Sequence, residues 1–140
     1  MKKGTGISKT NYFVIDQDFS DLISDIRNGA AGLQNSPPDI IRKTILFNDL
    51  SKMHCQEIIE NGKIQHYFYD YYDANGQIIA KFHSEPHLDK AYQTSTEPFH
   101  IHVKKDHQDL KAEKRVPNRY HKNLRSILEY IALNKEIQFK

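Results

Sequence analysis

The sequence lacks the features that mark several classes of protein. A single cysteine, Cys55, excludes an internal disulfide framework and a zinc site built on cysteines. No run approaches the roughly 20 apolar residues of a membrane-spanning helix, and the N-terminus has no apolar stretch of the kind found in signal peptides. With 140 residues, 38% apolar and 27% charged, we expect one soluble domain, 1–140, in the cytoplasm.

Local motifs of common catalytic and cofactor sites are also missing. The chain has no glycine-rich phosphate loop, no Cys-X-X-Cys pair and no His-Glu-X-X-His helix. No serine is singled out as the nucleophile of a Ser-His-Asp triad. Cys55 is expected to be a small buried apolar residue, because nothing near it in sequence would activate a thiolate. We therefore expect no cofactor.

Charge is distributed unevenly along the chain, although the net charge is only +2. Residues 1–102 carry 10 Lys and Arg against 13 Asp and Glu, whereas residues 103–140 carry 10 against 5. A basic C-terminal end favours an anionic partner such as nucleic acid. A solvated helix face explains the same charge equally well.

The first 40 residues predict a helix and a linker. Residues 1–11 are expected to be flexible, and residues 12–40 to hold both elements. Within Asp18–Gly29, the spacing of four apolar residues is helical, with Asp18 as the cap and Gly29 as the end. Those four residues are Phe19, Leu22, Ile23 and Ile26.

Residues 41–83 predict an antiparallel meander of four strands. Three turn signals, among them Asn61-Gly62, separate the strand-like runs. The first run has a helix after Pro38 as its alternative. The tyrosine-rich run 67–72 is expected in the core rather than as a base-stacking surface. The four runs are 41–47, 51–59, 63–73 and 77–83.

Two-residue loops at both Asn-Gly pairs would fix the strand register. Phe68 would then lie opposite Cys55 on one side and His83 on the other. On the same basis, Asp70 would face Met53 and Lys81, and Tyr69 would lie between His54 and Phe82.

The C-terminal part predicts a short strand, a charged connector and a helix. Alternation over 99–104 gives a strand with His100, His102 and Lys104 on one face, and 105–115 is expected to be irregular. The fold class is therefore α+β: an antiparallel four- to five-stranded meander over 41–104, an N-terminal helix and an amphipathic helix over 116–133. That helix has Tyr120, Leu124, Ile127, Leu128 and Ile131 on its apolar side, and Arg119, Lys122 and Arg125 opposite.

Histidines are concentrated late in the chain. None of the eight precedes His54, and six lie between His83 and His121. Imidazole titrates near neutral pH, so a cluster suits acid–base cleavage of RNA, with Lys81 and Lys104 stabilising the developing anion. Alternatives are a metal site on His87, His100 and His102, or backbone hydrogen bonding. A structural role is expected for His54, His66, His107 and His121.

Three segments resemble the TumE family of bacterial and archaeal toxin–antitoxin pairs, over about residues 41–131. They are the run from His66 to Ile79, the pair Pro86-His87, and the run from Pro98 to His102. The resemblance transfers to three histidines, His87, His100 and His102. Five positions depart from the family pattern: Lys81, His83, Ser84, Glu85 and Phe99.

The resemblance implies a toxin that inhibits growth and is neutralised by a helix-turn-helix antitoxin, with RNA as the expected target. We thus expect His87, His100, His102, Lys81 and Lys104 to be catalytic. The basic residues Arg115, Arg119, Lys122 and Arg125 are expected to bind RNA phosphates. A non-catalytic module that binds nucleic acid or protein, and a small metal enzyme, are the alternatives; a homodimer is also open.

Overall fold

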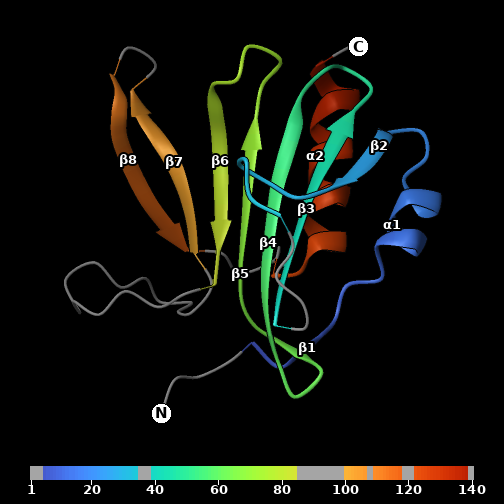
Figure 1. The fold of residues 1–140 in the computed structure, drawn as a ribbon. Coiled ribbons are helices and arrows are strands. Elements are labelled where there is room, and N and C mark those ends of the chain that lie inside the picture. The colour runs from blue at the N-terminus through green and yellow to red at the C-terminus, as the bar shows by residue number, and fades with distance from the viewer. Residues whose placement is uncertain (1–4, 35–38, 85–99, 107–108, 118–121, 139–140) are drawn as a thin grey trace.

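Seven strands follow one another across a single antiparallel sheet in a computed structural model, which describes residues 5–34, 39–84, 100–106, 109–117 and 122–138 (Figure 1). Strands β2 to β8 lie side by side in chain order, and the short β1 pairs with β5. The α+β class is confirmed, although the sheet has eight strands rather than four or five. The elements are β1 (Ile7–Ser8), α1 (Tyr12–Asp18), β2 (Ile23–Asn28), β3 (Ile40–Phe47), β4 (Lys52–Glu60), β5 (Lys63–Tyr72), β6 (Ile78–His83), β7 (His100–Asp106), β8 (Asp109–Pro117) and α2 (Leu124–Gln138).

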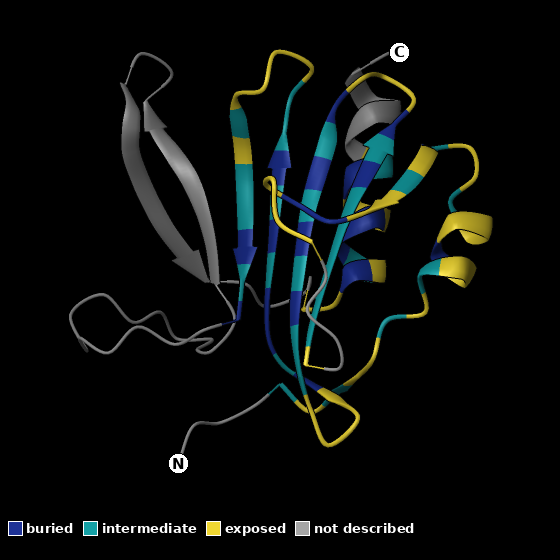
Figure 2. Ribbon diagram, viewed as in Figure 1, coloured by how far each residue is buried: buried dark blue, intermediate teal, exposed yellow. Residues whose placement is uncertain are grey.

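The two faces of the sheet differ in burial. Helix α2 lies behind β3 and β4 in Figure 1, and its apolar stripe joins the side chains of one face in the core. We call this the covered face; the other is the open face. Along β4 and β5 buried and half-buried residues alternate (Figure 2), as expected when one face is packed. The core includes Ile45, Met53, Tyr69, Phe82, Leu124, Ile127, Leu128 and Ile131.

The predicted helix over 18–29 is wrong. The helix, α1, comes earlier, with Asn11 as its cap, and residues 23–28 form β2. A β-bulge between Ile23 and Asp25 shifts the register with β3. Since a bulge adds one residue, Ile23 and Ile26 point to the same face although they are three apart. The bulged strand therefore gives its apolar residues the three-residue spacing that is typical of a helix.

The meander itself is confirmed, and its register in part. Phe68 pairs with His83, Tyr69 with Phe82 and Asp70 with Lys81, as predicted. Between β4 and β5 the predicted register is off by one, because the ladder shifts between Ile58 and Ile59. Phe68 consequently faces Gln56, Tyr69 faces Cys55 and Asp70 faces His54.

The C-terminal boundaries also need correction. Residues 105–115 are not an irregular connector, because β7 continues to Asp106 and β8 spans Asp109–Pro117. Charge did not prevent strand formation here, since charged residues are common where a strand lies at a sheet edge. The last helix begins at Leu124 rather than near 116, and the Asn123 side chain accepts a hydrogen bond from the Ser126 N–H.

Residues 5–18 are tied to the sheet. Ile7 pairs with Ile64, and the Thr10 hydroxyl donates to Glu57 Oε2 at 2.6 Å. Ile15 of α1 is buried in the core. In the described part of the chain, no helix is long and apolar enough to cross a membrane.

Candidate functional site

A row of polar residues crosses the open face at the middle of the sheet. Strand pairing sets His54 opposite Asp70, and Asp70 opposite Lys81. The same row continues through His102 on β7 to Arg115 on β8. Residues directly opposite in antiparallel strands share a face, with Cβ atoms about 5 Å apart. Five neighbouring strands thus bring one acidic residue and several basic residues into register.

The next row on the same face holds two more histidines. Gln56, Phe68, His83 and His100 follow one another across β4, β5, β6 and β7. The two segments that carry the predicted histidines therefore meet as paired strands. The sequence left this convergence open, and the site depends on it.

Asp70 and His83 form the best-defined polar contact of the site. His83 Nε2 lies 2.9 Å from Asp70 Oδ1, and the two side chains are 17% and 25% exposed. A carboxylate only accepts hydrogen bonds, so Nε2 must carry the proton, and neutral His83 then has its lone pair on Nδ1. The ring of Phe68 packs edge-on against His83, with centroids 5.0 Å apart. The imidazole is held from two sides.

A hollow of about 280 Å³ opens beside this contact. In Figure 1 the segment between β2 and β3 crosses in front of the open face, and Ala30 and Ala31 of that segment form one wall of the hollow. The other lining residues belong to the sheet: His54, Cys55, Gln56, Phe68, Asp70 and His83.

Two further histidines of the open face, His54 and His66, have buried ring nitrogens without hydrogen-bond partners. Burial lowers the pKa of His54, and the nearby Lys52 adds to this, while Asp70 acts in the opposite direction. His66 lies one row beyond Phe68, opposite Ile58, and is 6% exposed. Neither ring nitrogen of His66 has a hydrogen-bond partner. The structural role of both histidines stays a prediction.

The remaining predicted site residues are placed only in part. Lys104 has a register position on the same face of β7 as His102, opposite Glu113. His87 and Arg119 lie outside the described residues, and so do the side chains of β7 and β8. Among the described side chains, no group of three His, Cys, Asp or Glu is close enough to hold a metal ion.

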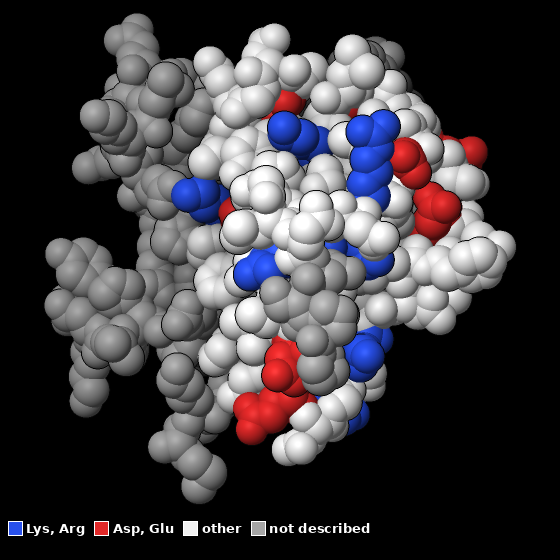
Figure 3. Space-filling model, viewed as in Figure 1, with Lys and Arg blue, Asp and Glu red and all other residues white. Residues whose placement is uncertain are grey.

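Arg125 lies away from the open face. It belongs to α2, on the covered side, where it contacts Asp18 at 2.6 Å and stacks over the Phe19 ring. Lys122 is exposed just before α2. Figure 3 shows other Lys and Arg side chains scattered over the open face, with Asp and Glu mainly near its lower and right margins.

Sequence reasoning did not assign Asp70, Gln56 or the Ala30–Ala31 wall to the site. The predicted register did put Asp70 beside Lys81, and an acid next to Lys and His on one face was the available signal. Nothing in the sequence indicates that the segment after β2 folds over this face.

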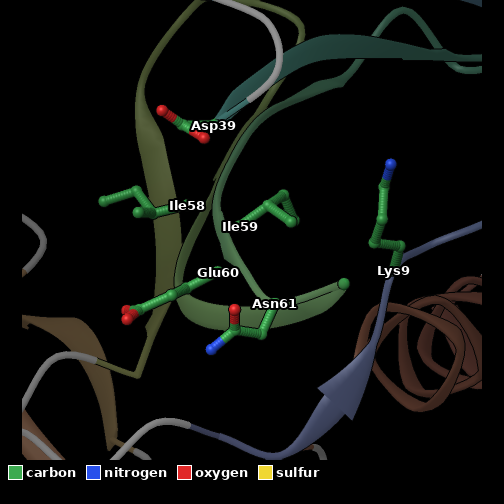
Figure 4. A pocket seen from close by; sticks show the side chains of 7 residues that line it. Lys9, Asp39, Ile58, Ile59, Glu60 and Asn61 are labelled. Atoms are coloured by element: carbon green, nitrogen blue, oxygen red, sulfur yellow. The ribbon is translucent and has the colours of Figure 1, made fainter.

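A larger hollow, of about 620 Å³, lies at the tip of the β4–β5 hairpin. Figure 4 shows that the carboxylates of Asp39 and Glu60 point in different directions there, while Lys9 approaches from the other side. Ile58 and Ile59 separate these charges. Without converging polar groups, this hollow is a weaker candidate.

Comparison with known proteins identifies one family. A family model described as "Toxin TumE" matches residues 12–134, which extends further toward the N-terminus than the segments noted above. No curated protein and no solved structure matches the chain.

Proposed function

The chain belongs to the TumE toxin family, and from this membership we propose that it acts on RNA, cleaving it at the open face of the sheet. Membership makes it a toxin of a toxin–antitoxin system with an antitoxin as partner. The observation that supports RNA cleavage most is the pairing of β6 with β7, which sets His83 opposite His100 and Lys81 opposite His102.

The proposed reaction needs no metal and no co-reactant. One imidazole accepts the proton of a ribose 2′-hydroxyl, whose oxygen forms a bond to phosphorus. The bond from phosphorus to the 5′-oxygen breaks, and a second imidazole donates a proton to that oxygen. The products are a 2′,3′-cyclic phosphate and a 5′-hydroxyl, so protons and bonds balance.

We assign roles from the register. His83 accepts the proton and becomes an imidazolium, which the carboxylate of Asp70 orients and stabilises. His100 donates a proton. Lys81, His102 and Lys104 stabilise the charge on phosphorus. His87 is a further candidate for proton transfer.

Phosphates of the RNA strand would contact the basic residues that flank this site. Arg115 continues the row of His102, and Arg119 and Lys122 follow it in the chain. Arg125 is the least suited, because Asp18 already neutralises it. Each phosphate contact should make the affinity more sensitive to salt.

Growth after induced expression provides the first test. Wild type should arrest a bacterial culture, whereas His83→Gln and the double change His100→Ala/His102→Ala should not. His66→Gln is the matched control, since it makes the same chemical change on the same face outside the proposed machinery. Soluble yield and melting temperature are measured for each variant. Arrest by all variants would place the toxic activity elsewhere.

Purified protein tests the chemistry directly. Cleavage of single-stranded RNA should persist in a chelator and stop when the nucleotide before the cut has a 2′-deoxyribose. Loss of cleavage in chelator would instead favour the metal enzyme with His87, His100 and His102 as ligands. RNA binding without any cleavage would favour the non-catalytic module.

We also propose a cytoplasmic site of action and an antitoxin of the helix-turn-helix type, as the resemblance implies. Co-expression of such a protein should restore growth. The purified antitoxin should elute together with the toxin in gel filtration. The elution volume of the toxin alone would show whether it forms a homodimer.

A further inference from the structure

We infer that the hollow beside Phe68 binds one unpaired base of the RNA strand. This inference rests on the proposed function and concerns the same face of the sheet. It assigns a substrate-recognition role to Phe68 and Gln56, and to the segment that folds over them.

The size of the hollow suits a single ring system. Its volume of about 280 Å³ is just below the range of about 300–1,000 Å³ typical of sites for drug-sized ligands. A longer ligand would extend onto the open face, where the phosphates and riboses of a strand would meet Lys81 and His83.

Phe68 supplies an apolar ring for stacking. It is half-buried on the open face, and its contact with His83 is edge-on, with an angle of 70° between the rings. His83 therefore does not lie flat against it. Aromatic side chains bind unpaired bases by stacking, whatever the sequence of the strand.

Polar groups in the same hollow match the edge of a base. Gln56 Oε1 accepts a hydrogen bond from Arg42 Nε at 3.2 Å, so the two donors of its amide nitrogen remain for a ligand. Asp70 uses Oδ1 for His83 and has Oδ2 as a further acceptor. A base presents donors and acceptors together on one edge, and this combination of an amide and a carboxylate complements it.

The wall opposite the sheet is preorganised. Ala30 and Leu33 pair through two backbone hydrogen bonds around Ala31 and Gly32, both at positive φ, as a type I′ turn requires. The Thr44 hydroxyl donates to the Gly29 carbonyl at 2.7 Å, and Arg42 Nη1 donates to that of Gln34 at 2.6 Å. A Cβ at Gly29 would lie 2.8 Å from the Leu33 carbonyl oxygen. The hairpin is thus fixed to β3, and its small alanines leave room for a ring.

The test uses short RNA homopolymers whose 2′-O-methyl groups prevent cleavage. Their binding to the full chain is measured by fluorescence anisotropy at one salt concentration. Phe68→Leu should weaken binding about tenfold and reduce the differences among homopolymers. Gln56→Ala is a second variant that changes those differences without altering the aromatic ring. Tyr72→Leu is the matched control: it lies on the same face of β5 but outside the hollow, and should bind as wild type.

The outcomes separate this inference from the proposed function. If the wild type cleaves RNA but folded Phe68→Leu and Gln56→Ala keep its affinity and base preference, the hollow does not hold a base, while the cleavage proposal stands. An equal loss in Tyr72→Leu would likewise overturn the inference, since the effect would not be specific to the hollow. Absence of RNA binding and cleavage in the wild type would overturn both.

Discussion

The two faces of strands β4, β5 and β6 are built from alternate residues of the same segments, yet they differ in almost every property. On the covered face, Cys55, Tyr69 and Phe82 are at most 2% exposed. On the open face, their neighbours His54, Asp70 and His83 are half-buried around a hollow. If RNA is cleaved at the open face as proposed, substitutions on the covered face should affect mainly stability, and substitutions on the open face mainly activity.

Two carboxylates illustrate the difference. Glu57 on the covered face is 1% exposed and accepts hydrogen bonds from the hydroxyls of Thr10 and Tyr69. Burial raises its pKa, although these donors and Lys43 act in the opposite direction. Asp70 on the open face contacts His83. One carboxylate anchors the N-terminal segment, and the other orients an imidazole.

The largest expected effect is on the covered face. Phe82→Ala should lower the free energy of unfolding by about 3–5 kcal/mol, the usual range for a fully buried phenylalanine. Phe68→Ala, the matched change on the open face, should lower it by less than about 2 kcal/mol, because this ring is only half-buried. Urea denaturation measures both. Equal losses would show that the open face is as important for stability as the core.

On the open face, the expected effect is on activity rather than on stability. Asp70→Asn should reduce RNA cleavage about 10- to 100-fold, since the amide orients His83 less well and stabilises its cation less. The free energy of unfolding should change by less than about 1 kcal/mol. Single-turnover cleavage and urea denaturation of the same preparation provide both numbers. A change in stability without a change in rate would assign Asp70 to the fold.

Glu57 predicts a pH dependence of stability from the covered face. Its pKa is higher in the folded than in the unfolded state, so the folded state binds more protons between those two values. The free energy of unfolding should therefore fall as pH rises through that window, by roughly 1.4 kcal/mol for each pH unit between the two pKa values.

Glu57→Gln should remove this fall, so that the variant gains stability relative to wild type as pH rises from the unfolded-state pKa of Glu57 to its raised folded-state pKa. Urea denaturation across this range measures the gain. Glu60→Gln, at the exposed end of the same strand, is the matched control and should follow the wild type. If the stability of Glu57→Gln depended on pH in the same way as that of the wild type, Glu57 would not be a buried carboxyl that titrates in this range.

Much of the sheet could be predicted from the sequence because its signals are local. Turn residues such as Asn61-Gly62 and alternation along β5 define the meander without knowledge of distant contacts. The bulges at Ile23 and Ile58 are different, because an extra residue reverses which side chains share a face. They account for the misassigned helix and for the shifted register.

The candidate site was predictable only as a set of residue types. Clustered histidines indicated where to look, but residues 84–99 separate β6 from β7, and a connection of that length does not fix the strand register as a two-residue turn does. Asp70 and His83 lie on neighbouring strands whose register the sequence predicts, whereas the wall at Ala30 meets residues far from it in the chain. Such long-range contacts follow from the assembled sheet and not from any local pattern.

The smallest effect concerns the ion pair of Arg125 with Asp18, whose side chains are 44% and 47% exposed. Exposed pairs contribute about 0.2–1 kcal/mol, so Arg125→Gln should lower stability by no more than that, and less at high salt.

Substitution of Arg125 also tests which face of the sheet binds RNA. Arg115→Gln, in the row of His102, should reduce the slope of log affinity against log salt by about 1. Arg125→Gln should leave that slope unchanged, because Asp18 already neutralises the guanidinium on the far side of the sheet. A reduced slope for Arg125→Gln and an unchanged one for Arg115→Gln would move the RNA from the open face to α2.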